Sequence, residues 1–163
     1  MTAVLQLIRD LLTQAGIAFR EVTHEPTYTS EDSARARGES MKIGGKALLM
    51  RADDKTLVFV LPADRKADSG AIRKELGIRK LRFASREELL ELTGLVPGSM
   101  PPFGKPVFPF PLYVDASIRD NEKIAFNAGS LTDSIVMLVA DYFRVAVPEK
   151  VFDFSVPPDA SGV

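Results

Sequence analysis

One lysine follows two glycines at the start of an apolar run. Gly44 and Gly45 precede Lys46, and the segment KALLMR continues from it. Glycine lets a backbone approach a ligand closely, and an ammonium at the mouth of a cleft suits a charged or carbonyl-bearing ligand. The alternative is an ordinary lysine at a strand edge, whose charged head reaches water along its apolar stem. Spacing alone leaves both interpretations open.

A long segment rich in proline and glycine, GLVPGSMPPFGKPVFPFP, spans residues 94–111. It contains six of the eleven prolines and three of the eleven glycines, too many for a regular helix or strand. Proline restricts φ and glycine permits close backbone approach, so together they can form a stiff concave wall. Rigid backbone N–H groups are what an oxyanion requires. The alternative is a loop that only crosses the surface.

Small polar side chains gather in FNAGSLTDS, residues 126–134. Asn127 and Ser130 could orient a small substrate and a water, although the same residue types are ordinary turn formers. The chain has one histidine, His24, which could act as an acid or base near neutral pH. No partner for it is identifiable in the sequence, so a structural or solvated role is the alternative.

Eight of the 21 basic residues concentrate in one stretch of the chain. With few acidic residues between them, they could follow the phosphates of an RNA stem and attract nucleic acid without regard to its sequence. The alternative is a solvated face with scattered charge. The stretch contains Arg65, Lys66, Arg73, Lys74, Arg79, Lys80, Arg82 and Arg86.

The composition limits the other kinds of chemistry. Cysteine is absent and histidine occurs once, which excludes thiolate nucleophiles, disulfides and multi-histidine metal sites. Neither a dinucleotide-binding nor a P-loop glycine motif is present. We therefore expect no metal and no cofactor. The net charge of −1 restricts any nucleic-acid contact to a local patch.

The length of 163 residues fits one domain spanning 1–163. No stretch approaches the roughly 18 apolar residues that would span a membrane, and no leader is evident at the first residues. We expect a cytoplasmic protein without membrane contact. Residues 155–163 are predicted to form a flexible tail.

Hydrophobic periodicity and capping residues predict alternating helices and strands. Thr29 or Ser30 can begin a helix that ends near Gly38, and Ser85 with Glu88 forms a capping box. The fold class that follows is α+β, with a curved mixed sheet that forms a partial barrel covered by helices. The predicted helices are 3–15, 30–38, 68–76, 85–94 and 141–147, and the predicted strands are 17–22, 46–51, 56–62, 81–84, 111–115, 123–129 and 134–139.

Several motifs, taken in order, carry a family resemblance. They are THEPTYTSEDSA, GGKALLM, LPADRKAD with LGIRKLRFAS, GLVPGSMPPFG, and VDASI followed by FNAGS. Their order and spacing from about residue 20 to 145 resemble the YbaK/prolyl-tRNA synthetase associated domain family. The resemblance implies hydrolysis of aminoacyl esters on mischarged tRNA, chiefly tRNA for proline carrying alanine or cysteine, with some relatives acting on serine or threonine attached to other tRNAs.

The resemblance also implies roles for individual residues. Lys46 corresponds to the central active-site lysine of the family. Relatives that edit alanine usually carry a histidine near the position of Asn127, where this sequence has Asn-Ala-Gly-Ser. The predicted catalytic residues are Lys46, Gly98 and Ser99; the predicted substrate-binding residues are Pro102, Phe103, Gly104, Asn127, Gly129, Ser130 and His24; the predicted tRNA-binding residues are Arg65, Lys66, Arg73, Lys74 and Lys80.

The hypothesis is a trans-acting deacylase that uses no side-chain nucleophile. Backbone N–H groups of the 98–104 loop would stabilise the oxyanion, Lys46 would hold the terminal adenosine phosphate or the ester carbonyl, and water would attack. The partners would be the acceptor end of mischarged tRNA and a cognate synthetase. One alternative is a non-catalytic module of the same fold that binds tRNA or a synthetase. Another is general nucleic-acid binding through the stretch from residue 65 to 86.

Overall fold

The computed structural model describes residues 3–158. Five α-helices and ten strands are found within this range. The helices are α1 (Ala3–Gln14), α2 (Ser30–Arg37), α3 (Ser69–Leu76), α4 (Arg86–Thr93) and α5 (Val139–Ala146), with short 3-10 helices η1 (Met41–Ile43) and η2 (Ala116–Asp120). The strands are β1 (Arg20–Thr23), β2 (Gly45–Ala52), β3 (Lys55–Pro62), β4 (Lys66–Ala67), β5 (Leu81–Phe83), β6 (Leu112–Asp115), β7 (Lys123–Asn127), β8 (Asp133–Leu138), β9 (Lys150–Phe152) and β10 (Ser155–Val156).

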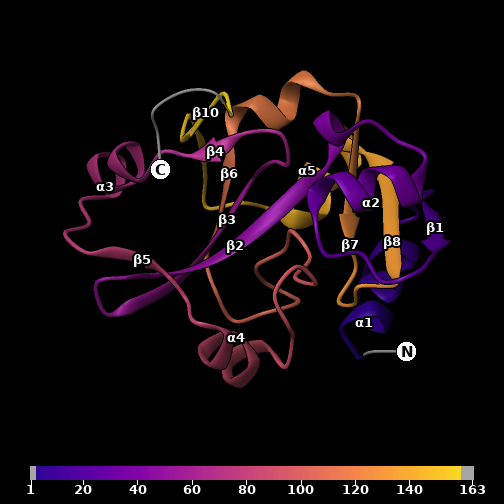
Figure 1. The fold of residues 1–163 in the computed structure, drawn as a ribbon, viewed down its shortest axis with the longest axis horizontal. Helices are drawn as coiled ribbons and strands as arrows, with labels where there is room; N and C mark the ends of the chain where they lie inside the picture. Colours follow the sequence, from indigo (N-terminus) through magenta and orange to yellow (C-terminus); the bar gives the residue numbers. More distant parts are fainter. Residues whose placement is uncertain (1–2, 159–163) are drawn as a thin grey trace.

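Two main sheets organise the molecule. The larger has the order β5-β2-β3-β6-β9 and mixes antiparallel with parallel pairs, and the smaller has the order β1-β8-β7. A bridge between Gly44 and Ala125 links β7 to the beginning of β2. Figure 1 shows the smaller sheet and α1 at one end of the molecule and α3 at the other. The predicted α+β class with a mixed sheet is confirmed, although the described strands do not close into a complete barrel.

The helix boundaries follow from local capping chemistry. The Thr29 hydroxyl accepts a hydrogen bond from the Asp32 amide at the start of α2, and Gly38 ends that helix in the left-handed conformation. At α4 the predicted capping box of Ser85 and Glu88 is present in full. These short polar signals placed the helices correctly because each boundary is decided by a few neighbouring residues.

Both faces of the larger sheet are buried. Alternate residues of β3 point to opposite sides, so Val58 and Val60 join one apolar cluster with α1 and β8, while Phe59 and Leu61 join a second cluster with α3. This explains why TLVFVLP is apolar without alternation. The 94–111 segment forms no helix or strand, as predicted, and the buried Phe103, Phe108 and Phe110 fix it to the first cluster.

The sequence did not predict three short strands. These are β4, which pairs with β10, and β9, which pairs with β6. β4, β9 and β10 have only two or three residues each, too few for a periodic pattern. The prediction of a flexible tail over 155–163 is wrong for its first two residues, because Ser155 and Val156 form β10. The remainder of that prediction, residues 159–163, lies outside the described residues. Strand β1 also begins later than predicted, at Arg20. Within the described residues, no helix is long and apolar enough to cross a membrane.

Candidate active site

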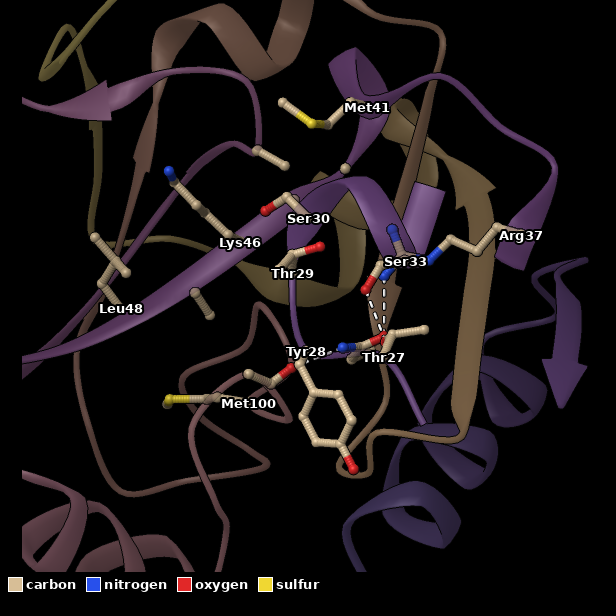
Figure 2. Close-up of a pocket in the computed structure, with 16 residues that line it drawn as sticks. Thr27, Tyr28, Thr29, Ser30, Ser33, Arg37, Met41, Lys46, Leu48 and Met100 are labelled. Atoms are coloured by element: carbon tan, nitrogen blue, oxygen red, sulfur yellow. Dashed lines mark hydrogen bonds between the residues drawn. The ribbon is translucent and has the colours of Figure 1, made fainter. Parts of the chain in front are cut away.

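A cavity of about 240 Å³ opens between α2, the beginning of β2 and the turn that contains Gly98. Its walls come from three distant parts of the sequence, residues 27–48, 98–100 and Asn127, with Ala63 closing one side. Figure 2 shows these side chains around the cavity, with the ring of Tyr28 at its edge. Tyr28 is 77% exposed. The cavity brings together the predicted Lys46 motif, the glycine-proline loop and Asn127.

Lys46 lines the cavity, but its amine has an internal partner. The Nζ donates a hydrogen bond of 2.6 Å to the backbone carbonyl of Arg65. In Figure 2 this amine points away from Met100, which belongs to the glycine-proline loop. Burial lowers the pKa of Lys46, an effect that the nearby carboxylate of Asp64 partly offsets and that Lys66 reinforces. Lys46 and the glycine-proline loop thus line the same cavity, but the amine is directed to the backbone of Arg65 and not to the loop (Figure 2).

Two residues of the glycine-proline loop line the cavity and have backbone N–H groups without a partner among the described residues. They are Gly98 and Met100. The Ser99 amide instead donates to Val96, and the Ser99 hydroxyl also bonds Val96, so Ser99 closes the turn rather than facing the cavity. Gly98 has φ of 87°, a conformation that glycine adopts without strain.

Three further predicted residues of this loop do not line the cavity. Phe103 is fully buried and packs edge-on against Phe126 and Tyr142. The Pro102 carbonyl accepts a hydrogen bond of 2.6 Å from the Tyr142 hydroxyl. A side chain at Gly104 would meet the backbone of Phe110 at 2.5 Å. All three hold the loop against the core from behind.

Arg37 is the main residue of the cavity that sequence reasoning missed. It is the last residue of α2 and only 8% exposed. Its Nε donates to Ser134 at 3.0 Å and one terminal nitrogen donates to Asn127 at 3.1 Å. No carboxylate pairs with it within residues 3–158. Burial lowers its pKa to about 10, so it remains charged at neutral pH.

Asn127 connects the walls of the cavity. Its Oδ1 accepts from Arg37 and from the Ser134 hydroxyl, and its Nδ2 donates to the Gly98 carbonyl at 2.7 Å. His24 does not line the cavity, but its Nε2 lies 2.8 Å from the same Ser134 hydroxyl. Asn127 therefore lines the cavity, and His24 is connected to it only through the Ser134 hydroxyl.

Gly129 and Ser130 support the site from the turn between β7 and β8. The Gly129 amide donates to the Ser99 carbonyl at 2.9 Å, which ties this turn to the glycine-proline loop. The Ser130 hydroxyl donates to Asp133 at 2.7 Å. Neither residue lines the cavity.

The predicted basic residues are spread over β4, α3 and the β5 region. Arg65 lies beside Lys46, but its guanidinium donates to the side chain and carbonyl of Ser155. Lys66, Arg73, Lys74 and Lys80 are exposed. Arg82, which belongs to the same stretch, is paired with Glu88 at 2.7 Å.

The charged residues in the described lining of the cavity are all cations. Two of its lining residues, Arg37 and Lys46, are cations, and the described lining contains no carboxylate. No group of three or more metal-ligating His, Asp or Glu side chains occurs within residues 3–158. Such a cavity suits a neutral polar group that acquires negative charge, because both cations favour the charged form.

Comparisons with known proteins agree with this arrangement. The family model of the aminoacyl-tRNA editing domain matches residues 24–145. Over 147 residues the chain is 37% identical to the multifunctional Ser/Thr-tRNA deacylase ProXp-y of Escherichia coli K12, covering 86% of this chain and 87% of that protein. It is also 36% identical over 113 residues to a proline–tRNA ligase of Shouchella clausii, of which it spans only 19%.

A solved structure confirms the fold independently of sequence. A crystal structure described as a candidate trans-editing enzyme for prolyl tRNA synthetase superposes with a TM-score of 0.82 over 96% of this chain and 99% of that one, at 22% identity. The fold and the cavity thus define an editing domain. The chain belongs to the aminoacyl-tRNA editing domain family, and its predicted class, a hydrolase acting on the aminoacyl ester of mischarged tRNA, is confirmed.

Proposed function

We propose that this protein removes serine or threonine from mischarged tRNA by hydrolysing the aminoacyl ester in the cavity between α2 and Gly98. The observation that carries the proposal is the one-sided cavity, with two cations, two free amides and no lining carboxylate. The similarity to a Ser/Thr-tRNA deacylase over most of both chains supports this choice of amino acid.

The free amides of Gly98 and Met100 supply the oxyanion donors. As water attacks the ester carbonyl, negative charge develops on its oxygen, and preorganised N–H groups stabilise that charge at no cost of rearrangement. Lys46 and Arg37 lie on different sides of the cavity in Figure 2. Both add positive potential, which is strong in a partly desolvated site.

The attacking group is water, because the described lining contains no thiol, and no histidine or carboxylate that would activate one of its hydroxyl groups as a nucleophile. The ribose hydroxyl next to the ester orients this water, and the ribose oxygen that leaves takes up a proton. Lys46 stabilises the ribose and phosphate of the terminal adenosine, since its amine lies beside the backbone of Arg65 and is reached from that side.

The polar wall formed by Arg37, Asn127 and Ser33 explains a preference for a hydroxyl-bearing amino acid. The terminal nitrogen of Arg37 that has no partner can donate to the side-chain oxygen of serine or threonine. A site built to hydrogen-bond a hydroxyl discriminates strongly against analogues that lack it, because its own polar groups would be left unpaired. Alanine is then the poorer substrate.

A deacylation panel tests this function. The wild-type protein and the variant Lys46→Ala are assayed on tRNA charged with alanine, cysteine, serine or threonine. We expect Ser-tRNA and Thr-tRNA to be hydrolysed fastest by the wild type, and the variant to be slower by about 100-fold because it loses the cation that positions the terminal adenosine, and with it the ester. The matched control is Lys55→Ala, an exposed lysine at the far end of the β2–β3 hairpin, which should retain the wild-type rate.

Two outcomes would contradict the proposal. Undiminished deacylation by Lys46→Ala would remove this lysine from the mechanism. Binding of tRNA without turnover on every charged species would favour the non-catalytic module. General nucleic-acid binding makes a different prediction, since Arg73→Ala with Lys74→Ala would then weaken DNA and tRNA binding alike.

A further inference from the structure

A second cavity, of about 170 Å³, lies directly beside the first. It lies along residues 47–49 of β2 and extends toward β5 and the beginning of α4. Both cavities are lined by Ala47, Leu48, Gly98 and Met100. They are therefore adjacent, with these four residues between them.

The second cavity differs in chemistry from the first. Its lining is mostly apolar, with Leu48, Leu89 and Pro97 around it and the ring of Phe83 at its rim. Phe83 is 54% exposed although it belongs to a strand paired with β2. Arg86, the first residue of α4, is the cation of its lining. None of the aromatic ring contacts of the described residues involves Phe83.

An exposed aromatic ring beside an apolar hollow and an arginine is the combination that binds single-stranded nucleic acid. A base stacks on the ring and the adjacent phosphate meets the cation, and this recognition tolerates any base because every base has a π face. The apolar lining provides a floor for the base, and Arg86 provides the charge.

We propose that the second cavity binds the nucleotide that precedes the aminoacylated adenosine of tRNA, with its base stacked on Phe83 and its phosphate near Arg86. This inference rests on the proposed function, which places the aminoacyl ester in the first cavity. The adjacency of the two cavities, which both have Gly98 and Met100 in their lining, carries it. The exposed Lys80 precedes the same strand, so the incoming RNA strand passes a basic surface.

A double substitution, one in the protein and one in the RNA, tests the stack. The substrates are Ser-charged RNA minihelices whose penultimate nucleotide is either intact or abasic, and kcat/KM is measured for the wild type and for Phe83→Ala. We expect either change alone to lower kcat/KM by about tenfold, the usual effect of one lost stack. Both changes together should lower it by about the same tenfold, because one contact cannot be lost twice.

Two further variants control for folding and geometry. Phe83→Trp keeps an aromatic face and should restore the sensitivity to the abasic substitution. Leu7→Ala removes an exposed apolar side chain on α1 that lines neither cavity, and should leave the tenfold effect of the abasic RNA in place. Effects that multiply to about 100-fold in the doubly changed pair, or no effect of the abasic residue on the wild type, would overturn the proposal.

The test separates this inference from the proposed function. If the wild type hydrolyses no charged RNA, the function fails, and the same cycle is then measured as affinity for uncharged minihelices by fluorescence anisotropy. Coupling between Phe83 and the penultimate base in that assay would still establish the subsite. A Phe83→Ala variant that lost affinity for a synthetase, with no coupling to the RNA base, would identify the surface as a protein contact and overturn the proposal.

Discussion

The guanidinium of Arg37 is held at Nε by Ser134 and at one terminal nitrogen by Asn127. Its remaining terminal nitrogen has no partner among the described residues, and the residue lines the cavity. A buried cation without a carboxylate is costly unless a ligand or a network compensates for it. We therefore propose that Arg37 binds the acyl group.

We expect Arg37→Met to lower kcat/KM on Ser-tRNA by about 100-fold, since a site loses a charged donor to the substrate. The loss on Ala-tRNA should be smaller, because alanine has no hydroxyl to bind. Arg37→Lys should not rescue activity, because one ammonium cannot reproduce the forked geometry that Ser134 and Asn127 hold. Equal losses on Ser-tRNA and Ala-tRNA would show that Arg37 acts on the ester alone.

The burial of Lys46 leads us to predict that this residue lowers the stability of the fold to an extent that depends on pH. Its pKa is lowered in the folded state, chiefly by burial, so the folded protein binds this proton less tightly than the unfolded chain does. The protonated amine therefore destabilises the fold at neutral pH, and this penalty disappears as the pH rises toward the ordinary value of 10.5. We expect Lys46→Met to melt at a higher temperature than the wild type at pH 7, with a difference that narrows toward alkaline pH. Thermal melts across this range would contradict the account if the difference stayed constant.

At the scale of elements, the turn that carries Gly98 is fixed from several sides. Asn127 holds the Gly98 carbonyl, Gly129 holds the Ser99 carbonyl, and Ser99 closes the turn onto Val96. These contacts engage the carbonyls of the turn and leave the amides of Gly98 and Met100, two residues that line the cavity, without a partner among the described residues. The turn can therefore keep its donors in place before substrate arrives, which is the condition for oxyanion stabilisation.

We expect Gly98→Ala to cost about 1–2 kcal/mol of unfolding free energy, because φ at this position is 87° and an L side chain is strained there. An added methyl would also lie 3.4 Å from Leu131. We expect the deacylation rate to fall even under conditions in which the variant remains folded, since the donor amides shift with the turn. Denaturant unfolding and deacylation rates measure the two effects. Gly70→Ala in α3 is the control, because φ at Gly70 is not positive, and it should retain activity.

Most elements could be predicted from sequence because their signals are local. The capping box at Ser85, the glycine ends of α2 and α3 and the apolar run of β3 each depend on adjacent residues. β9 and β10 could not be predicted, since each is a short strand that exists only through its partner. Arg37 was missed for a related reason. A helix that ends in Arg-Ala-Arg has the pattern of a solvated helix. The second arginine, Arg37, is buried because it contacts Asn127 of β7 and Ser134 of β8.

At the scale of the whole molecule, the site lies where the two main sheets meet. The bridge between Gly44 and Ala125 joins them immediately before Lys46. The core behind the site contains the fully buried Phe103 and Phe126, so the glycine-proline loop is fixed to β7 of the smaller sheet. The sequence motifs predicted that the loop forms a functional wall, but not which of its residues line the cavity. That division depends on long-range packing, which gives Phe103 and Gly104 a supporting position and places Gly98 and Met100 in the cavity lining.

The central claim is that the ester carbonyl sits against the amides of Gly98 and Met100. The crystal structure of the protein with a non-hydrolysable seryl-adenosine amide tests it most directly. The account predicts the acyl carbonyl oxygen about 3 Å from one or both of these amide nitrogens, with the serine hydroxyl toward Arg37. An analogue bound with its carbonyl turned away from this turn, or bound outside the cavity, would contradict it.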